Sequence, residues 1–322
     1  MDCARLIAGN KQYTQSIAQS GRHKVSINLN MSCEAIRRRV FQRGRQDYSF
    51  LEEHLSATFS DANTYCYSVD ADATEEFAAS ISALSDCLSN VVVSSPRRQF
   101  DGTGQNQIRG HLDCMHAARK RAWEYAVLLQ NHDIILKTHS EMASIFRALD
   151  GTNDVAAKEC SEERCIEGME RNMGRLGLCP RGLKRREGEV CKARNVTFAA
   201  GVMQVSISLA AVEFLFNQLH VDTFLDDLHK IGHGQDEEFW GTLNSNEEIS
   251  LPGGFTSRCI GRTDSFTRLT RWSSQSPCRS GHDRHGICLL GVEDLPDLAL
   301  SPFFVANKER RREEGQSPCP FR

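Results

Sequence analysis

The chain has 322 residues, enough for one large domain or two ordinary ones. Hydrophobic residues make up 40% and charged residues 25%, which are globular values and exclude a fibrous or disordered chain. The net charge of −3 argues against nucleic acid as a partner. Short basic clusters at 37–39, 184–186 and 310–312 each have acids nearby, a pattern typical of solvated surface.

Cysteine usage indicates an oxidising compartment. There are 13 cysteines, an odd number, so at least one thiol is expected to stay unbridged or to pair with another chain. No Cys-x-x-Cys occurs, so neither a thioredoxin-type motif nor a zinc ribbon is present. Two glycosylation sequons begin at Asn30 and Asn195. Together these features favour a protein of the secretory pathway.

The first residues do not resemble a targeting segment. They lack the basic and apolar regions of a signal peptide, and the longest uncharged stretch, 195–212, is too polar to cross a bilayer. The sequence therefore indicates either a cytosolic protein or a chain that lacks its true N-terminus. The cysteines favour the second interpretation.

The predicted elements begin after a polar N-terminal region. Residues 1–60 are rich in Arg and Gln and are expected to form a stem-like segment, while 61–322 form the main domain. A β-branched and aromatic run predicts a strand over 64–69. Apolar residues at helical spacing predict a helix over 73–88, and a short strand follows at 90–93.

Strands and helices continue to alternate. We expect a helix over 105–123, a strand over 125–129 and a helix that starts at Ser140 as N-cap and ends at Gly151. Such alternation is typical of an α/β fold with a largely parallel sheet.

The second half of the chain is less regular. Residues 151–194 are charged and contain four cysteines, so they are predicted to form a surface insertion that its own disulfides could hold together. The core is expected to resume at Thr197, with an amphipathic helix over 209–219. After Pro252 the chain is expected to be loop-rich to its end.

Two groups of residues could bind a metal ion. Asp70 and Asp72 follow the first predicted strand, where carboxylates could hold Mg²⁺ or Mn²⁺ against a diphosphate. The alternative is a polar turn in which Asp72 caps the next helix. A second group has spacing that suits zinc, and its alternative is a small disulfide loop with exposed histidines. This group comprises Cys278, His282, His285 and Cys288.

One acid near the end of the chain could act as a general base. Glu237 begins an apparent helix together with Asp236 and Glu238, but neighbours on a helix point about 100° apart, so these acids do not form a dyad. A carboxylate within hydrogen-bond reach could remove a proton from a sugar hydroxyl. The alternative is a solvent-facing first turn that the helix dipole stabilises.

Isolated cations and one tryptophan complete the candidate site. Arg284 and Lys308 could hold a departing diphosphate, since fixed cations stabilise developing negative charge. Trp272 could stack on the face of an acceptor sugar, although tryptophan is more often a core residue. Asp133 and Lys137 follow a predicted strand and either shape the floor of the site or form a buried ion pair.

The order and spacing of these residues resemble the core-2/I-branching β-1,6-N-acetylglucosaminyltransferases. The motif Asp-Glu-x-x-Trp-x-Thr is matched from Asp236 to Thr242, a tight Pro-Gly-Gly turn follows, and 291–308 also match. Lys308 aligns directly, whereas Arg284 needs a shift of one residue. The resemblance covers nearly the whole chain.

The resemblance implies a function and a fold. It implies transfer of GlcNAc from UDP-GlcNAc to the 6-hydroxyl of an acceptor glycan, with inversion, by a Golgi protein that needs neither metal nor cofactor. Membrane contact would come only through an anchor. Glu237 would be the base, and Asp70, Arg284 and Lys308 would contact the UDP-sugar. The implied fold is GT-A-like, a mostly parallel twisted sheet flanked by helices, with a loop-rich, disulfide-linked C-terminal part.

The resemblance also implies disulfides and one departure from the family pattern. The implied bridges are Cys33–Cys87, Cys66–Cys114, Cys278–Cys288 and Cys3–Cys319. The apolar first strand that the family carries before Tyr65 has no counterpart, which predicts unpaired backbone groups and weak nucleotide binding. A non-catalytic glycan-binding protein of the same fold is therefore the rival hypothesis.

Overall fold

The structure is a computed structural model. It describes residues 3–20, 31–34, 36, 48–130, 132–161, 169–230, 234, 237–262 and 265–308. Predictions that fall on Asn30, Asp236 and Cys319, and on the segment before Tyr48 where the strand was expected to be missing, lie outside these residues. None of the described helices has the length and apolar character that a membrane span requires.

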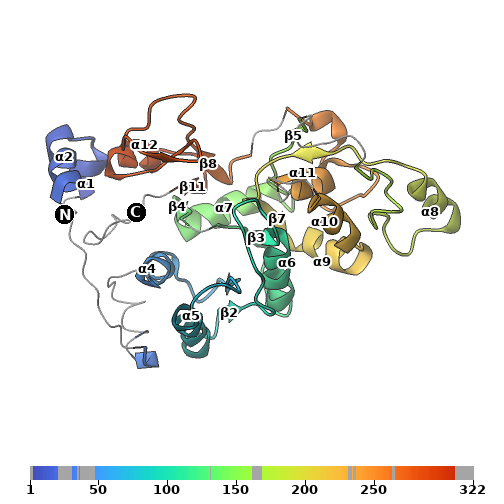
Figure 1. Cartoon of the computed structure of the whole chain (residues 1–322), viewed down its shortest axis with the longest axis horizontal. Coiled ribbons are helices and arrows are strands. Elements are labelled where there is room, and N and C mark those ends of the chain that lie inside the picture. The colour runs from blue at the N-terminus through green and yellow to red at the C-terminus, as the bar shows by residue number, and fades with distance from the viewer. Residues whose placement is uncertain are drawn as a thin grey trace.

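Helices and strands alternate along most of the described chain (Figure 1). The first half contains α1 (Cys3–Ile7), α2 (Lys11–Ser20), α4 (Tyr48–Thr58), β1 (Tyr65–Tyr67), α5 (Glu75–Cys87), β2 (Val91–Val93), α6 (Gln107–Ala118), β3 (Tyr125–Val127), β4 (Ile134–Ile135) and α7 (His139–Leu149). The second half contains β5 (Lys158–Glu159), α8 (Arg185–Lys192), β6 (Ala199–Ala200), β7 (Ser206–Ser208), α9 (Leu209–Gln218), α10 (Asp222–Leu228), α11 (Glu237–Ser245), η1 (Ser257–Cys259), β8 (Arg268–Thr270), β9 (Asp283–Arg284), β10 (Ile287–Cys288), η2 (Val292–Asp294), α12 (Leu295–Ala299) and β11 (Val305–Asn307).

The predicted helices are present, but their ends differ from the sequence pattern. The hydroxyl of Thr74, not the side chain of Asp72, caps α5 by accepting a hydrogen bond from the backbone of Phe77 at 3.2 Å. Thr138, not Ser140, begins α7 with a capping box. Helix α6 ends at Ala118, earlier than predicted, and the indole of Trp123 donates to the carbonyl of Ala118 at 3.1 Å.

The chain is α/β as predicted, but its described strands do not form one mostly parallel sheet. β1 pairs with β2 and β8 with β11 in parallel, whereas β3 pairs with β7 and β4 with β11 antiparallel. Pairing direction depends on how each segment returns to the sheet, which local sequence does not encode. Among the described strands, none joins β1 to β3.

The largest core cluster packs around β3, β7, α6 and α9–α11. Phe224, Phe239 and Trp240 are fully buried in it. Met173, Leu176 and Leu178 are also fully buried there, although they belong to the predicted surface insertion 151–194. That prediction needs correction, because the high charge of the segment comes from residues that flank these apolar anchors. A disulfide between Cys179 and Cys191 closes part of the same segment.

The N-terminal region packs onto the rest of the chain. Helix α2 lies against η2, and α1 lies against α12 near the other end of the sequence (Figure 1). Leu6 is fully buried, and Leu55 of α4 enters a second cluster beneath α5. The described parts of residues 1–60 therefore contribute to the core, in addition to their polar surface.

Four disulfides join described cysteines. Three of them are bridges that the resemblance implies: Cys33–Cys87, Cys66–Cys114 and Cys278–Cys288. Cys66–Cys114 connects β1 to α6 with Cα atoms 5.6 Å apart. This bridge therefore attaches the small β1–β2 sheet to the larger core.

Candidate functional site

Three cationic side chains converge where β11 ends. Lys308 follows β11, and its carbonyl accepts a hydrogen bond from the backbone of Leu290 at 2.8 Å. Burial lowers the pKa of the Lys308 ammonium, and the positive charges of Arg284 and Arg268 lower it further. The charge of Asp133 acts in the opposite direction, so the positive charge around Lys308 is partly balanced by this carboxylate.

A closed ring of hydrogen bonds holds this end of β11 in place. Arg268 donates to the amide oxygen of Asn307 at 2.7 Å and to that of Gln204 at 2.8 Å. Asn307 and Gln204 in turn donate to the carboxylate of Asp133, at 2.5 and 3.1 Å. Asp133, Gln204 and Asn307 are at most 2% exposed. We call these four residues the Asp133 ring.

Asp133 is the acceptor for the amide groups of both Gln204 and Asn307. Its carboxylate also accepts the backbone N–H of Gln130 at 2.7 Å. Burial raises the pKa of Asp133, while this backbone bond and the charge of Arg268 act in the opposite direction. The side chain of Lys137 donates to the carbonyl of Ser301 instead. The alternative of an Asp133–Lys137 ion pair is therefore wrong.

Glu237 lies at the first turn of α11. Its backbone N–H donates to Gly234 at 3.0 Å, and its carbonyl accepts from Gly201 at 2.8 Å. The residue is half-buried, whereas Glu238 beside it is fully buried in the core. Of the two acids in this turn, Glu237 is the one that solvent or a ligand can reach.

Helix α11 packs unusually close to β6, which fixes the position of Glu237. A Cβ atom at Gly241 would lie 2.6 Å from the carbonyl oxygen of Ala199, and one at Gly201 would lie 2.2 Å from that of Ala156. Both distances are shorter than real Cβ contacts. Only glycine at position 241 allows this approach of α11 to β6, and only glycine at position 201 allows the close passage of Ala156.

The backbone connects Glu237 to the Asp133 ring over a short path. The backbone N–H of Gly201 donates to the carbonyl of Glu237, and Gln204 of the ring follows Gly201 by three residues in the sequence. Three residues span at most about 11 Å. The loop before α6 meets the same region, because Gly234 donates to the carbonyl of Thr103 at 2.9 Å.

Asp70 organises a turn in this structure. Its carboxylate accepts the backbone N–H groups of Asp72 at 3.0 Å and Phe100 at 3.4 Å, and its carbonyl accepts two bonds from Arg97. The described residues contain no cluster of three acidic, His or Cys side chains suited to a metal ion. The two backbone bonds to the Asp70 carboxylate are those of a polar turn, although Asp72 is not the helix cap.

Trp272 lies beside the disulfide loop that carries Arg284. Its backbone bridges to Ile287, and its side chain is 42% exposed, which is unusual for an indole. Cys278 and Cys288 are bonded to each other, so their sulfur atoms are not zinc ligands. Asn195 is exposed, as a glycosylation acceptor must be.

Sequence reasoning missed Gln204 as a member of the site. It was visible only as a polar residue between Met203 and Val205 in the uncharged stretch 195–212. A polar side chain between buried neighbours requires hydrogen-bond partners, and this was the available signal.

A mixed α/β fold tied by disulfides is compatible with a glycosyltransferase. Comparison with known proteins supports this class. The model of the core-2/I-branching enzyme family matches residues 40–299, and the chain belongs to that family.

Two relatives illustrate the similarity. The β-1,3-galactosyl-O-glycosyl-glycoprotein β-1,6-N-acetylglucosaminyltransferase 4 of Mus musculus is 24% identical over 274 residues, which cover 82% of this chain and 60% of that protein. The N-acetyllactosaminide β-1,6-N-acetylglucosaminyl-transferase of Homo sapiens is 24% identical over 278 residues, which cover 82% and 65%. The chain thus spans less than two thirds of the length of either relative.

Proposed function

We propose that this protein is an inverting glycosyltransferase that moves GlcNAc from UDP-GlcNAc to the 6-hydroxyl of an acceptor glycan. Family membership and the names of its relatives support the reaction class. The observation that carries the proposal is the pair of cations Arg284 and Lys308 beside the buried Asp133 ring, whose Arg268 adds a third positive charge. Such a group suits a diphosphate.

In the proposed reaction Glu237 removes the proton from the acceptor hydroxyl as its oxygen attacks the anomeric carbon of the donor. The bond from that carbon to the diphosphate breaks, and UDP leaves with the electron pair. Arg284 and Lys308 stabilise the charge that develops on UDP. Asp70 contributes to the donor side, and Trp272 offers an indole face to the acceptor sugar.

The proposal assigns the catalytic charge stabilisation to side chains, so a divalent metal and a cofactor are not required. Donor and acceptor are the partners, and nucleic acid is not one of them. The disulfides and the exposed Asn195 support a location in the secretory pathway, for which we propose the Golgi.

A transfer assay tests the proposal. Radiolabelled UDP-GlcNAc is incubated with mucin-type acceptors, and the linkage of the product is determined. Glu237→Gln should reduce turnover by about 10²–10⁴-fold, the range for loss of a general base, and should leave acceptor binding unchanged. Glu76→Gln, at an exposed position of α5, is the matched control. Equal turnover of the Glu237→Gln variant and the native chain would contradict the assignment.

A second candidate is a glycan-binding protein of the same fold without transferase activity. The sequence departure noted above favours it, because the apolar first strand that the family carries before Tyr65 has no counterpart in this sequence. This candidate predicts acceptor binding with no transfer from any UDP-sugar. The same assay therefore distinguishes the two functions.

A further inference from the structure

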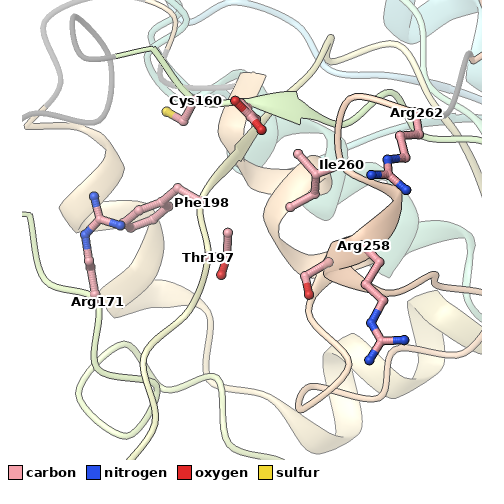
Figure 2. A pocket seen from close by; sticks show the side chains of 9 residues that line it. Cys160, Arg171, Thr197, Phe198, Arg258, Ile260 and Arg262 are labelled. Carbon is pink, nitrogen blue, oxygen red and sulfur yellow. The ribbon is translucent and has the colours of Figure 1, made fainter.

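A cavity of about 490 Å³ lies between the β5–β6 pair and η1 (Figure 2). Its volume falls within the range of roughly 300–1,000 Å³ of small-molecule sites. Arg258, Arg262 and Ile260 form one wall, and Arg171 with Phe198 forms the opposite wall. Thr197 lies between the two walls.

The lining carries an excess of positive charge. The guanidinium group of Arg171 lies 5.3 Å from the ring centroid of Phe198. Within the described part of the chain, Arg171, Arg258 and Arg262 form no ion pair, and Glu159 is the one carboxylate that lines the cavity. Other arginines, such as Arg109, are paired with aspartates.

An acid beside η1 that interacts with the charge of Arg258 is already engaged. Glu247 accepts the backbone N–H of Ser257 at 2.9 Å and its hydroxyl at 3.3 Å. These bonds, the backbone bond first, lower the pKa of Glu247, and the charge of Arg258 adds to the effect. The carboxylate is thus committed to the start of η1, and guanidinium donors remain available to a ligand.

Backbone contacts hold the cavity walls in place. The N–H and C=O of Thr197 bond to the side chain of Asn246, each at 2.9 Å. Gly261 lies between Arg258 and Arg262 in the sequence, and its backbone N–H donates to the carbonyl of Ala157 at 2.8 Å. A cavity whose walls are fixed in this way loses little entropy when a ligand binds.

A short backbone path joins the cavity to the residue that bonds the proposed catalytic base. Thr197 stands four residues before Gly201, so the two are at most about 14 Å apart along the chain. The backbone N–H of Gly201 donates to the carbonyl of Glu237. An oligosaccharide could therefore extend from Glu237 into the cavity. Hydroxyl groups of Thr197 and Ser257 suit sugar hydroxyls, and guanidinium forks match the planar geometry of carboxylates and the oxygens of sulfates.

We propose that this cavity is a subsite for an acidic sugar residue of the acceptor glycan, bound through its carboxylate or sulfate group by Arg258 and Arg262, with Arg171 opposite. The identification of the ligand as part of an acceptor rests on the proposed function. The binding of an acidic saccharide can be measured without any donor.

Calorimetric titration of the full chain tests the subsite with three related ligands: a neutral disaccharide, its sialylated form and its sulfated form. One or both acidic forms should bind at least about tenfold more tightly than the neutral form, and the advantage should shrink as salt rises. The form that binds more tightly identifies the acidic group. Equal affinity for all three ligands would overturn the proposal.

Variants separate the subsite from the catalytic site. Arg258→Ala with Arg262→Ala should remove the preference for acidic ligands, whereas Arg186→Ala, at an exposed position of α8, should preserve it. Glu237→Gln should reduce transfer by about 10²–10⁴-fold and leave the binding of acidic ligands intact. If the native chain binds the acidic disaccharide without any transfer, the proposed enzyme activity fails and the subsite stands. An unchanged preference in the double variant, with native near-ultraviolet circular dichroism, would refute the subsite.

Discussion

The Asp133 ring predicts a specific effect of Asp133→Asn, a substitution that hardly changes side-chain volume. Arg268 can only donate, and within the ring each amide accepts one bond from Arg268 and donates to Asp133, while Gln204 also donates to Gln130 at 2.7 Å. All donors therefore point towards Asp133, which only accepts. An asparagine at position 133 would place two N–H donors opposite the amide groups of Gln204 and Asn307, which already donate towards this position.

Amide flips do not repair the variant. If Asn307 turned its oxygen towards position 133, its nitrogen would face the guanidinium of Arg268 instead. At least one buried donor is left unsatisfied, at a cost of about 1–3 kcal/mol, and the lost charge of Asp133 adds to this. We expect the free energy of unfolding to fall by about 2–4 kcal/mol. Displacement of Lys308, the next residue after Asn307, should also weaken UDP binding.

Thermal unfolding and UDP titration measure both effects. Asp133→Asn should melt several degrees below the native chain, while Asp86→Asn, at an exposed position of α5, should stay within about 0.5 kcal/mol of it. A melting temperature and a UDP affinity that both match the native chain would refute the ring as the element that positions Lys308.

Three further predictions follow from single features. Lys308→Ala should raise the Kd of UDP by tenfold or more, as measured by titration calorimetry. Burial depresses the pKa of Lys308, so its ammonium loses its proton at a lower pH than that of an ordinary lysine. As the pH rises, UDP binding by the native chain should therefore begin to weaken at this lower pH. Replacing Cys66 and Cys114 by serine should cost about 2–5 kcal/mol of stability, seen in denaturant unfolding, and an unchanged midpoint would contradict the bridge. Burial lowers the pKa of His111 from 6.5 to about 4, so between these pH values the unfolded chain binds a proton that the folded chain does not bind. The contribution of His111 to stability should be complete above pH 6.5 and should decline by at most about 3 kcal/mol as the pH falls to about 4. His111→Gln should make this decline smaller in melting curves.

Local elements were predictable because their signals are local. The apolar spacing along α5 and the β-branched run of β2 indicate their type without tertiary information. The ends were less predictable, because several side chains compete to cap a helix. Thr138 is the N-cap in place of Ser140, because Glu141 stands three residues after Thr138, the position that a capping box requires.

Tertiary features were not predictable from single segments. The charged composition of 151–194 concealed the few apolar residues, such as Met173, that enter the core. The Asp133 ring joins residues from four distant segments, and no spacing rule relates Asp133 to Gln204 or Arg268. The family resemblance supplied Glu237 and Lys308 as candidates, whereas the residues that hold Lys308 in place required the structure.

A crystal structure of the chain with UDP-GlcNAc would test the central claim most directly. We expect one donor molecule to place its diphosphate against Arg284 and Lys308, and to leave the carboxylate of Glu237 facing its anomeric carbon with room for an acceptor hydroxyl between them. A donor bound elsewhere, or a Glu237 carboxylate pointing away from the bound sugar, would contradict the account.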